Sequence, residues 1–157
     1  MHPSAQRVAD AARQRGLDVT IVEFAQTTRS AQEAADAIGC AVAQIVKSLM
    51  FEVKGEAVMA LVSGANQLDE RKLAALRGVG RKQVRRAPAE LVKATTGFTI
   101  GGVPPFGHAQ PLPVYVDADL LQHAEVWAAA GTPFAVFAIT PAALVAAAAG
   151  TVADLKQ

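Results

Sequence analysis

The stretch from residue 95 to residue 108 constrains the fold more than any other part of the chain, because it places four glycines and two adjacent prolines in fourteen positions. A flexible linker of this length is normally polar. This stretch instead carries four apolar side chains that favour burial against the rest of the protein: Phe98, Ile100, Val103 and Phe106. The glycine pair at 101–102 can adopt positive φ and leave backbone N–H groups accessible, while the proline pair at 104–105 stiffens the far side. The pattern predicts a rigid loop, and it fits both the wall of a ligand pocket and a structural turn between strands.

The composition indicates one globular domain that covers residues 1–157. The chain is 52% hydrophobic and 18% charged, which excludes an intrinsically disordered protein. Charged residues interrupt every apolar stretch before it reaches the ~18 residues of a membrane span. The N-terminus also lacks the basic and apolar layout of a secretion signal. We therefore expect a cytoplasmic protein without membrane contact.

The residue types that usually hold cofactors or carry covalent catalysis are sparse. Cys40 is the only cysteine, so neither an internal disulfide nor a multi-cysteine metal site can form. The histidines at 2, 108 and 123 lack metal-ligand spacing, and the sequence holds neither a phosphate-binding P-loop nor a nucleophile elbow. We expect no metal and no cofactor.

Hydrophobic periodicity, caps and turn residues predict helices that alternate with short strands. Helices are expected over residues 4–15, 30–38, 69–76, 88–96 and 140–149. Strands are expected over residues 19–24, 47–53, 57–62, 83–86, 114–117, 125–128 and 134–139, with a β-hairpin around Lys54-Gly55-Glu56. Because hairpins and helical crossovers coexist, the expected fold is a single α/β domain with a mixed β-sheet flanked by helices.

The charge distribution is uneven although the net charge is only +1. Residues 71–93 contain a single acid, Glu90, and eight of the fifteen basic residues. These eight are Arg71, Lys72, Arg77, Arg81, Lys82, Arg85, Arg86 and Lys93. A basic face on a nearly neutral protein suits a polyanion bound on one side, through phosphates neutralised by lysine and arginine. An ordinary solvated surface explains the same run of charge.

Lys47 interrupts the apolar run from Ile45 to Phe51, which otherwise predicts a buried strand. A lysine in such a run costs desolvation unless it reaches the edge of the sheet or meets an anion. One interpretation is a lysine that protects an exposed strand edge. The other is a cation at the floor of a pocket, with three N–H donors for a phosphate or a developing oxyanion.

Three segments, taken in this order and spacing, carry a resemblance to a known family: Gln44-Ile-Val-Lys47-Ser-Leu, Leu61-Val-Ser-Gly64 and Gly97-Phe-Thr-Ile-Gly-Gly-Val-Pro-Pro-Phe-Gly-His108. The last contains a G-x-x-x-P pattern as Gly101-Gly-Val-Pro-Pro105, and Val114-Tyr-Val-Asp117 follows it. Over nearly its whole length the chain resembles the YbaK/ProX family of aminoacyl-tRNA deacylases. These are relatives of the editing domain inserted in bacterial prolyl-tRNA synthetases. The resemblance implies the YbaK/ProX fold.

The resemblance also implies an activity, the trans hydrolysis of the ester that joins a small noncognate amino acid to the terminal ribose of a tRNA. Lys47 matches the family's functional lysine and is expected to hold the terminal phosphate or the ester carbonyl. The backbone N–H groups of Gly101 and Gly102 are the expected oxyanion donors. Lys47 is not expected to act as a general base, because an ammonium beside a phosphate stays protonated. The residues expected to bind the substrate are Ser63, Gly64, Phe98, Pro104, Pro105, Gly107, His108 and Asp117.

With this activity the basic segment becomes a candidate tRNA contact. The residues expected to bind tRNA are Arg71, Lys72, Arg81, Lys82, Arg85 and Arg86, and prolyl-tRNA synthetase is a candidate partner. The alternative function is a non-catalytic module that binds aminoacyl-tRNA or a synthetase. A small-molecule sensor without nucleic acid is disfavoured by the basic segment.

Overall fold

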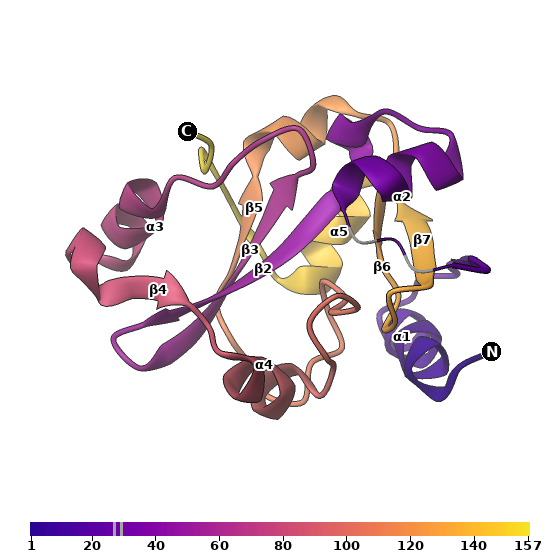
Figure 1. The fold of residues 1–157 in the computed structure, drawn as a ribbon, viewed down its shortest axis with the longest axis horizontal. Coiled ribbons are helices and arrows are strands. Elements are labelled where there is room, and N and C mark those ends of the chain that lie inside the picture. Colours follow the sequence, from indigo (N-terminus) through magenta and orange to yellow (C-terminus); the bar gives the residue numbers. More distant parts are fainter. Residues whose placement is uncertain (27, 29) are drawn as a thin grey trace.

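The computed structural model describes residues 1–26, 28 and 30–157 of the chain. Its strands form two β-sheets with helices packed around them (Figure 1). The larger sheet has five strands in the order β4-β2-β3-β5-β8, and the smaller sheet has three in the order β1-β7-β6. The structure confirms the predicted α/β domain with a mixed sheet and adds the separate antiparallel sheet.

The larger sheet is built on the predicted hairpin. Its strands are β2 (Val46–Val53), β3 (Glu56–Ser63), β4 (Val84–Arg86), β5 (Val114–Asp117) and β8 (Thr151–Ala153). Lys54 and Gly55 both have positive φ, 50° and 82°, as a tight hairpin turn between twisted strands requires. Strand β4 pairs with only the outer part of β2, from Phe51 to Val53, whereas β5 and β8 extend the sheet in parallel beyond β3.

The smaller sheet crosses the other end of β2. Its strands are β1 (Ile21–Glu23), β6 (Val126–Ala129) and β7 (Ala135–Ile139), all antiparallel. A parallel bridge between Ile45 and Trp127 joins it to the start of β2. The segment of β2 that β4 does not reach therefore faces β6 instead.

The helices begin and end close to the predicted residues. They are α1 (Pro3–Gln14), α2 (Ala31–Ile38), α3 (Glu70–Arg77), α4 (Ala89–Thr96) and α5 (Pro141–Ala148), together with the short 3-10 helices η1 (Val42–Gln44), η2 (Arg81–Gln83) and η3 (Ala118–Gln122). Ser30, Asp69 and Thr140 accept hydrogen bonds from backbone N–H groups of the first turn, as N-caps do. Strand β8 and helix η3 were not predicted, because each is only a few residues long and depends on its neighbours.

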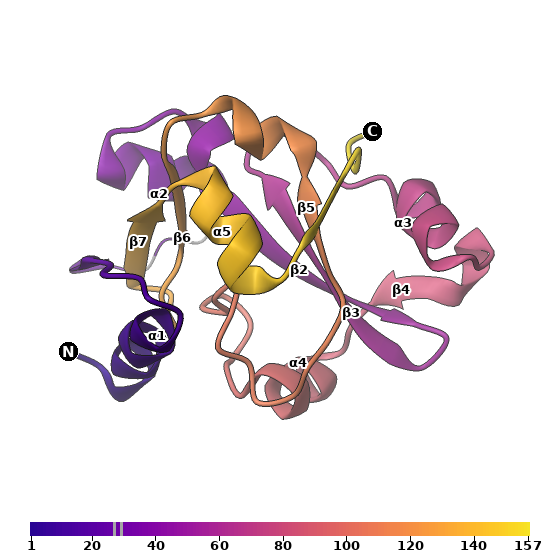
Figure 2. The same ribbon diagram turned by 180° about the vertical axis from the view of Figure 1, so that it is seen from behind.

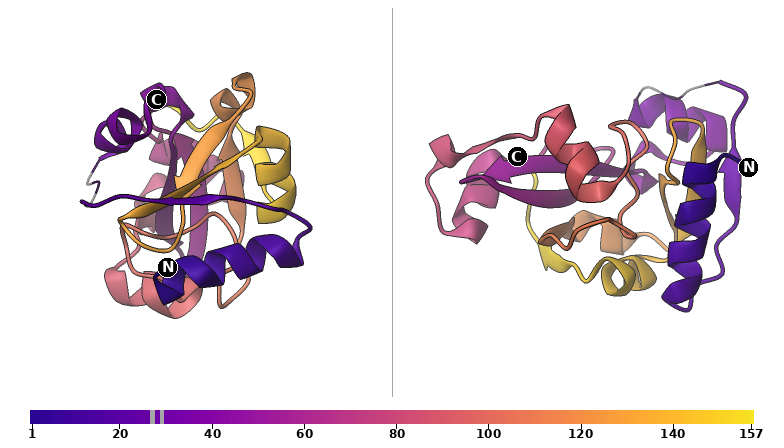
Figure 3. Two further views of the ribbon diagram at one scale, coloured as in Figure 1. Left: turned by 90° about the vertical axis from the view of Figure 1, so that its right-hand side faces the viewer. Right: turned by 90° about the horizontal axis from the view of Figure 1, so that it is seen from below.

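The two faces of the larger sheet carry separate apolar cores. Helix α5 lies against one face (Figure 2), and the core on that side also takes in α1, α4 and the glycine-rich loop, with an edge-to-face contact of 5.7 Å between Phe106 and Phe137. The opposite face packs Phe51 and Tyr115 against Leu73 of α3. Helix α3 and β4 lie at one end of the molecule, and α1 with the smaller sheet lies at the other (Figures 1 and 3).

Candidate active site

An apolar cavity of about 700 Å³ lies between the start of β2, helix α2, the glycine-rich loop and the smaller sheet. Most of its lining is aliphatic or aromatic, with Ile45, Val103 and Trp127 as the large contributors. Its polar lining residues include Thr28, Ser30, Gln32, Lys47, Ser48, Arg86 and Thr132. None of the described lining residues is a histidine, cysteine, aspartate or glutamate. The cavity is therefore suited to a small, mainly apolar group with a polar attachment point.

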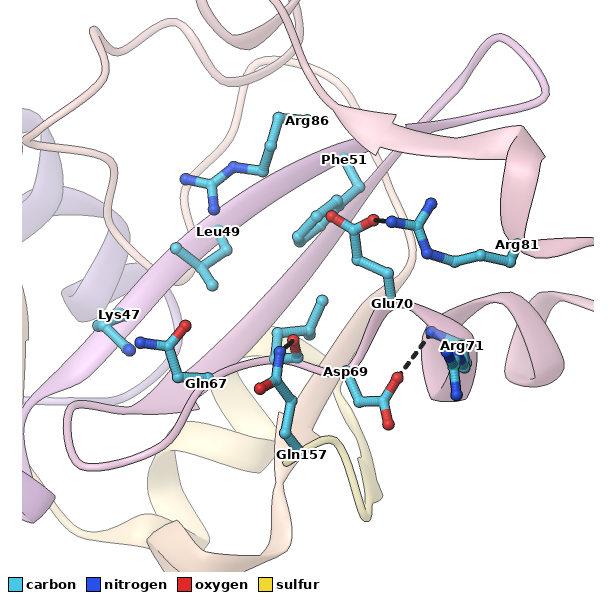
Figure 4. Close-up of a pocket in the computed structure, with 11 residues that line it drawn as sticks. Lys47, Leu49, Phe51, Gln67, Asp69, Glu70, Arg71, Arg81, Arg86 and Gln157 are labelled. Carbon is cyan, nitrogen blue, oxygen red and sulfur yellow. Dashed lines mark hydrogen bonds and ion pairs between the residues drawn. The ribbon is translucent and has the colours of Figure 1, made fainter.

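A second, charged cavity of about 710 Å³ lies on the face of the larger sheet that carries α3 (Figure 4). Its floor is the β2 face with Lys47, Leu49 and Phe51. Its walls are charged or polar, formed by the segment from Gln67 to Arg71 together with Arg81, Arg86 and Gln157. Lys47, Leu49 and Arg86 line both cavities, so the two meet at this part of β2.

Lys47 is half-buried and held by one strong contact. Its Nζ donates a hydrogen bond to the backbone carbonyl of Asn66 in the turn after β3. Burial, and secondarily the nearby charge of Arg86, lower the pKa of Lys47 below its usual value, and Asp117 opposes this shift. An ammonium has three N–H donors, so two remain for a ligand. Both sequence interpretations are partly met, because Lys47 lies where β4 no longer covers the edge of β2 and also at the junction of two cavities.

The carboxylate of Asp117 organises the turn that receives Lys47. It is 1% exposed and accepts hydrogen bonds from the Ser63 N–H at 3.0 Å and from the Asn66 side chain at 2.9 Å. The Ser63 hydroxyl donates to the carbonyl of Ala43 at 2.7 Å. Ser63 and Asp117, both predicted to bind the substrate, thus line neither cavity. They hold the turn from which Asn66 positions Lys47.

Gly64, which the sequence predicts to bind the substrate, lines the apolar cavity. A Cβ atom at this position would lie 2.4 Å from the carbonyl oxygen of Val42. Only glycine therefore lets η1 and the turn after β3 approach this closely at the cavity wall.

The two central glycines of the loop have different roles. Gly101 has φ of 101°, is exposed and lines the apolar cavity, and its N–H has no hydrogen-bond partner among the described residues. Gly102 is buried, and its N–H donates to the carbonyl of Thr99 at 3.1 Å. A Cβ atom on Gly102 would lie 2.7 Å from the backbone of Thr132. The prediction of paired oxyanion donors is corrected accordingly, since the Gly101 N–H is available and the Gly102 N–H is already used within the loop.

The remaining loop residues predicted to touch substrate anchor the loop instead. Phe98, Pro104 and Pro105 are buried and line neither cavity. The guanidinium of Arg7 on α1 lies 4.3 Å from the centre of the Phe98 ring. The loop presents a different set of side chains to the apolar cavity, Ile100 and Val103 on either side of the glycine pair.

His108 and Gly107 close the loop against α1. The Nε2 of His108 donates to the carbonyl of Pro104 at 2.7 Å, and a Cβ atom on Gly107 would lie 2.7 Å from that of Ala11. Burial lowers the pKa of His108, which favours the neutral imidazole that this contact uses. Both were predicted to bind the substrate, but neither lines either cavity.

Ser48 lines the apolar cavity and was not among the predicted site residues. Its Oγ is buried, and it is the one such side-chain atom without a hydrogen-bond partner in the part of the chain that the structure describes. It also borders a small extension of about 60 Å³ beside Gly101 and Val103. A buried hydroxyl without a partner costs stability, so Ser48 is a candidate contact for a polar group in this cavity. A serine within an apolar strand, next to the unusual lysine, is the sequence signal that points to it.

Comparison with known proteins identifies the family of this site. The family model described as "Aminoacyl-tRNA editing domain" matches residues 25–147. The chain belongs to this family. It is 34% identical over 128 residues to the protein YwhH of Bacillus subtilis (strain 168), covering 81% of this chain and 78% of that protein. It is 28% identical over 127 residues to an Enterococcus faecalis (strain ATCC 700802 / V583) protein named "Putative Cys-tRNA(Pro)/Cys-tRNA(Cys) deacylase EbsC", covering 80% and 76%.

A solved structure is also similar along the entire editing domain. It is described as "Crystal structure of a putative trans-editing enzyme for prolyl tRNA synthetase". It shares 50% sequence identity with this chain and superposes with a TM-score of 0.94, covering 100% of this chain and 99% of the other. The YbaK/ProX resemblance and the fold that it implied are thereby confirmed.

In this editing domain, the basic segment is less free than its sequence indicates. Acids from other elements pair with several of its cations: Glu52 with Arg85, Glu56 with Arg77, Glu70 with Arg81 and Asp154 with Lys72. Of the predicted tRNA-binding residues, Arg71, Arg81 and Arg86 line the charged cavity, whereas Lys72, Lys82 and Arg85 do not. Among the described residues, no helix is long and apolar enough to cross a membrane.

Proposed function

We propose that this editing domain hydrolyses the ester between a small noncognate amino acid and the terminal ribose of a tRNA. The observation that carries the proposal is the position of Lys47, where an apolar cavity and a charged cavity meet. An aminoacyl-tRNA has the same two-part chemistry, since a small side chain and a polyanion are joined at one ester. The ester would lie at Lys47, with the amino acid in the apolar cavity.

The lining groups supply charge stabilisation for such a reaction. Attack by water on the ester carbonyl places negative charge on its oxygen, and a preorganised cation or N–H group lowers the barrier there. Lys47 can supply such a donor, and so can the Gly101 N–H, which has no hydrogen-bond partner among the described residues. The carbon–oxygen bond to the ribose then breaks, and the ribose oxygen takes up a proton.

The described lining of the apolar cavity provides no carboxylate or imidazole base. We infer that the water is activated by a group of the substrate, and the free hydroxyl of the terminal ribose is the nearest such group to the ester. Ser48 would hold the amino acid through its unpartnered hydroxyl. Pocket size would then select the amino acid, because a single methylene changes binding by only ~1–3 kcal/mol and larger groups must be excluded by steric clash.

The comparisons support a substrate in which a small amino acid is attached to tRNA(Pro). The Enterococcus faecalis relative is named as a deacylase of Cys-tRNA(Pro) and Cys-tRNA(Cys), and the solved structure is described in relation to prolyl tRNA synthetase. We therefore propose alanine, serine and cysteine esters of tRNA(Pro) as the first substrates to test, and prolyl-tRNA synthetase as the partner.

The decisive experiment is a deacylation panel with these three esters, the cognate prolyl ester and matched esters of another tRNA. Lys47→Met removes the charge and keeps most of the side-chain length. Lys54→Met, in the exposed hairpin turn, is the control for loss of a lysine. We expect rapid loss of at least one small ester with wild type and Lys54→Met only. Salt-dependent tRNA binding with no turnover of any ester would instead identify a non-catalytic binding module.

A further inference from the structure

The charged cavity is large enough and polar enough to be a binding site in its own right. It has about the same volume as the apolar cavity, and four cationic side chains line it against two carboxylates, Asp69 and Glu70. Both carboxylates already have partners. Asp69 caps α3 by accepting the Arg71 N–H at 2.9 Å, and Glu70 forms an ion pair with Arg81. The cavity thus retains an excess of positive charge for an anion.

Two of its arginines have no carboxylate partner among the described residues. Arg71 is exposed, and its side chain makes no hydrogen bond or ion pair within the described chain. The guanidinium of Arg86 lies 5.4 Å from the centre of the Phe51 ring, which holds it over the cavity floor by a cation–π contact. A guanidinium fits a phosphate with two parallel hydrogen bonds, so both arginines suit phosphodiesters.

The arrangement of the lining gives the cavity a direction. Figure 4 shows Lys47 beside Gln67 at one end and the Glu70–Arg81 pair towards the other. Lys47 also lines the apolar cavity, as Leu49 and Arg86 do. A chain of phosphates that begins at Lys47 would therefore run along β2 towards α3.

The walls between the cations offer amide groups and apolar surface. The Gln157 backbone N–H donates to the Gln67 carbonyl at 2.9 Å, which fixes one wall. Leu49 and Phe51 form the floor. Cationic grooves beside apolar surface are typical of sites for single-stranded nucleic acid, whose bases are unpaired and can lie flat against the protein.

We infer that the charged cavity binds the single-stranded 3′ end of the tRNA, through the phosphates that precede the terminal ribose. This inference rests on the proposed function for the position of the ester. It separates the predicted basic residues into two groups. Arg71, Arg81 and Arg86 bind the single strand, and the cations outside the cavity do not.

The inference predicts that the effect of an arginine in this cavity depends on substrate length. We would compare Arg71→Gln with wild type on three esters of one amino acid: aminoacyl-adenosine, an aminoacyl trinucleotide ending in CCA, and the aminoacyl-tRNA. Glutamine keeps the helix propensity of arginine in α3. Arg13→Gln on α1, at the other end of the molecule, is the matched control.

For Arg71→Gln we expect kcat/KM to fall about fivefold on the trinucleotide and on the tRNA at low salt, and to be unchanged on aminoacyl-adenosine. The slope of log KM against log salt should flatten by about 0.7, the value for one fewer phosphate neutralised on a single strand. Arg13→Gln should match wild type on all three esters. An equal loss on aminoacyl-adenosine, or no loss on the trinucleotide, would overturn the inference and leave the deacylase proposal intact.

A binding measurement keeps the inference testable if wild type hydrolyses no ester. The 5′-phosphorylated trinucleotide CCA is titrated into wild type, Arg71→Gln and Arg13→Gln, with inorganic phosphate as a competitor. Weaker binding by Arg71→Gln alone would support the RNA site even though the deacylase proposal had failed. Equal binding by all three proteins, or binding of inorganic phosphate as tight as that of the trinucleotide, would overturn it.

Discussion

The two cavities that meet at Lys47 have nearly the same volume, about 700 and 710 Å³, and opposite chemistry. The apolar cavity lies along the edge of β2 that β4 leaves uncovered, and segments from distant parts of the chain enclose it. The charged cavity lies on one face of the same strand, and α3 and β4 bring arginines to it. Strand β2 thus lies between a cavity suited to a small side chain and a cavity suited to phosphates, and Lys47 lines both.

The largest expected effect comes from the residue that the cavities share. Lys47→Met should lower kcat/KM for aminoacyl-tRNA about 100-fold or more, as loss of one preorganised oxyanion donor does. The loss should be similar on aminoacyl-adenosine, because Lys47 acts at the ester. It is measured by single-turnover deacylation, with Lys47→Arg as the variant that keeps the charge. A loss confined to the tRNA would instead place Lys47 in the charged cavity alone.

The next effect distinguishes the two glycines at the rim of the apolar cavity. Gly102→Ala should destabilise the fold by about 2 kcal/mol or more, because its Cβ atom meets the backbone of Thr132 at 2.7 Å and the loop must move. Gly101→Ala has room, with the nearest atom at 3.8 Å, but its φ of 101° strains alanine by about 1–2 kcal/mol.

Urea unfolding of the two glycine variants measures the difference. Gly102→Ala should be the less stable of the pair, and it should also lose deacylation because the cavity wall shifts. If Gly101→Ala proved the more destabilised, close packing at residue 102 would not be what fixes the loop.

The variant Ser48→Ala tests whether the Ser48 hydroxyl in the apolar cavity binds the substrate. We expect kcat/KM for small esters to fall about tenfold, the effect of one hydrogen bond to the substrate of roughly 1.4 kcal/mol. Stability should stay the same or rise by up to about 1 kcal/mol, since the variant removes a buried hydroxyl without a partner. Lower activity with unchanged or higher stability identifies a ligand-binding role. A fall in both would make Ser48 an ordinary structural residue.

The smallest effect concerns a residue outside both cavities. The pKa of His108 is lowered in the folded state by burial, so the folded protein resists protonation below pH ~6.5, where the unfolded chain takes up a proton. Stability should therefore decrease as the pH falls from 7 to 5, by up to about 1.4 kcal/mol per pH unit from this group. In His108→Asn that slope should be shallower.

Denaturant unfolding at several pH values measures this slope, and deacylation by His108→Asn near pH 7.5 should stay close to wild type. A strong loss of activity at unchanged stability would mean that His108 contacts the substrate, contrary to its position behind the loop.

Structural features that depend only on residues close together in the chain could be predicted from the sequence. The N-caps at Ser30 and Asp69 and the turn at Lys54-Gly55 were predicted at the residues where they occur, because each involves atoms only a few positions apart. Lys47 could be singled out as a candidate site residue because a lysine in an apolar strand costs desolvation whatever the position of that strand in the fold. The sequence did not reveal how far the charges of the basic segment are already paired, because Glu52 and Asp154 form ion pairs with it from distant parts of the chain.

By itself, the sequence predicted the five helices, most of the strands and the family, and it singled out Lys47 and the glycine-rich loop as candidates for the site. The tertiary structure decided which face of each element meets a cavity. Gly101 and Gly102 are adjacent and chemically identical, yet one lines the apolar cavity and the other packs against Thr132. Likewise Ser48 is a candidate ligand contact only because its buried hydroxyl has no hydrogen-bond partner among the described residues. Such distinctions depend on atoms brought together from distant positions, and local propensities carry no information about them.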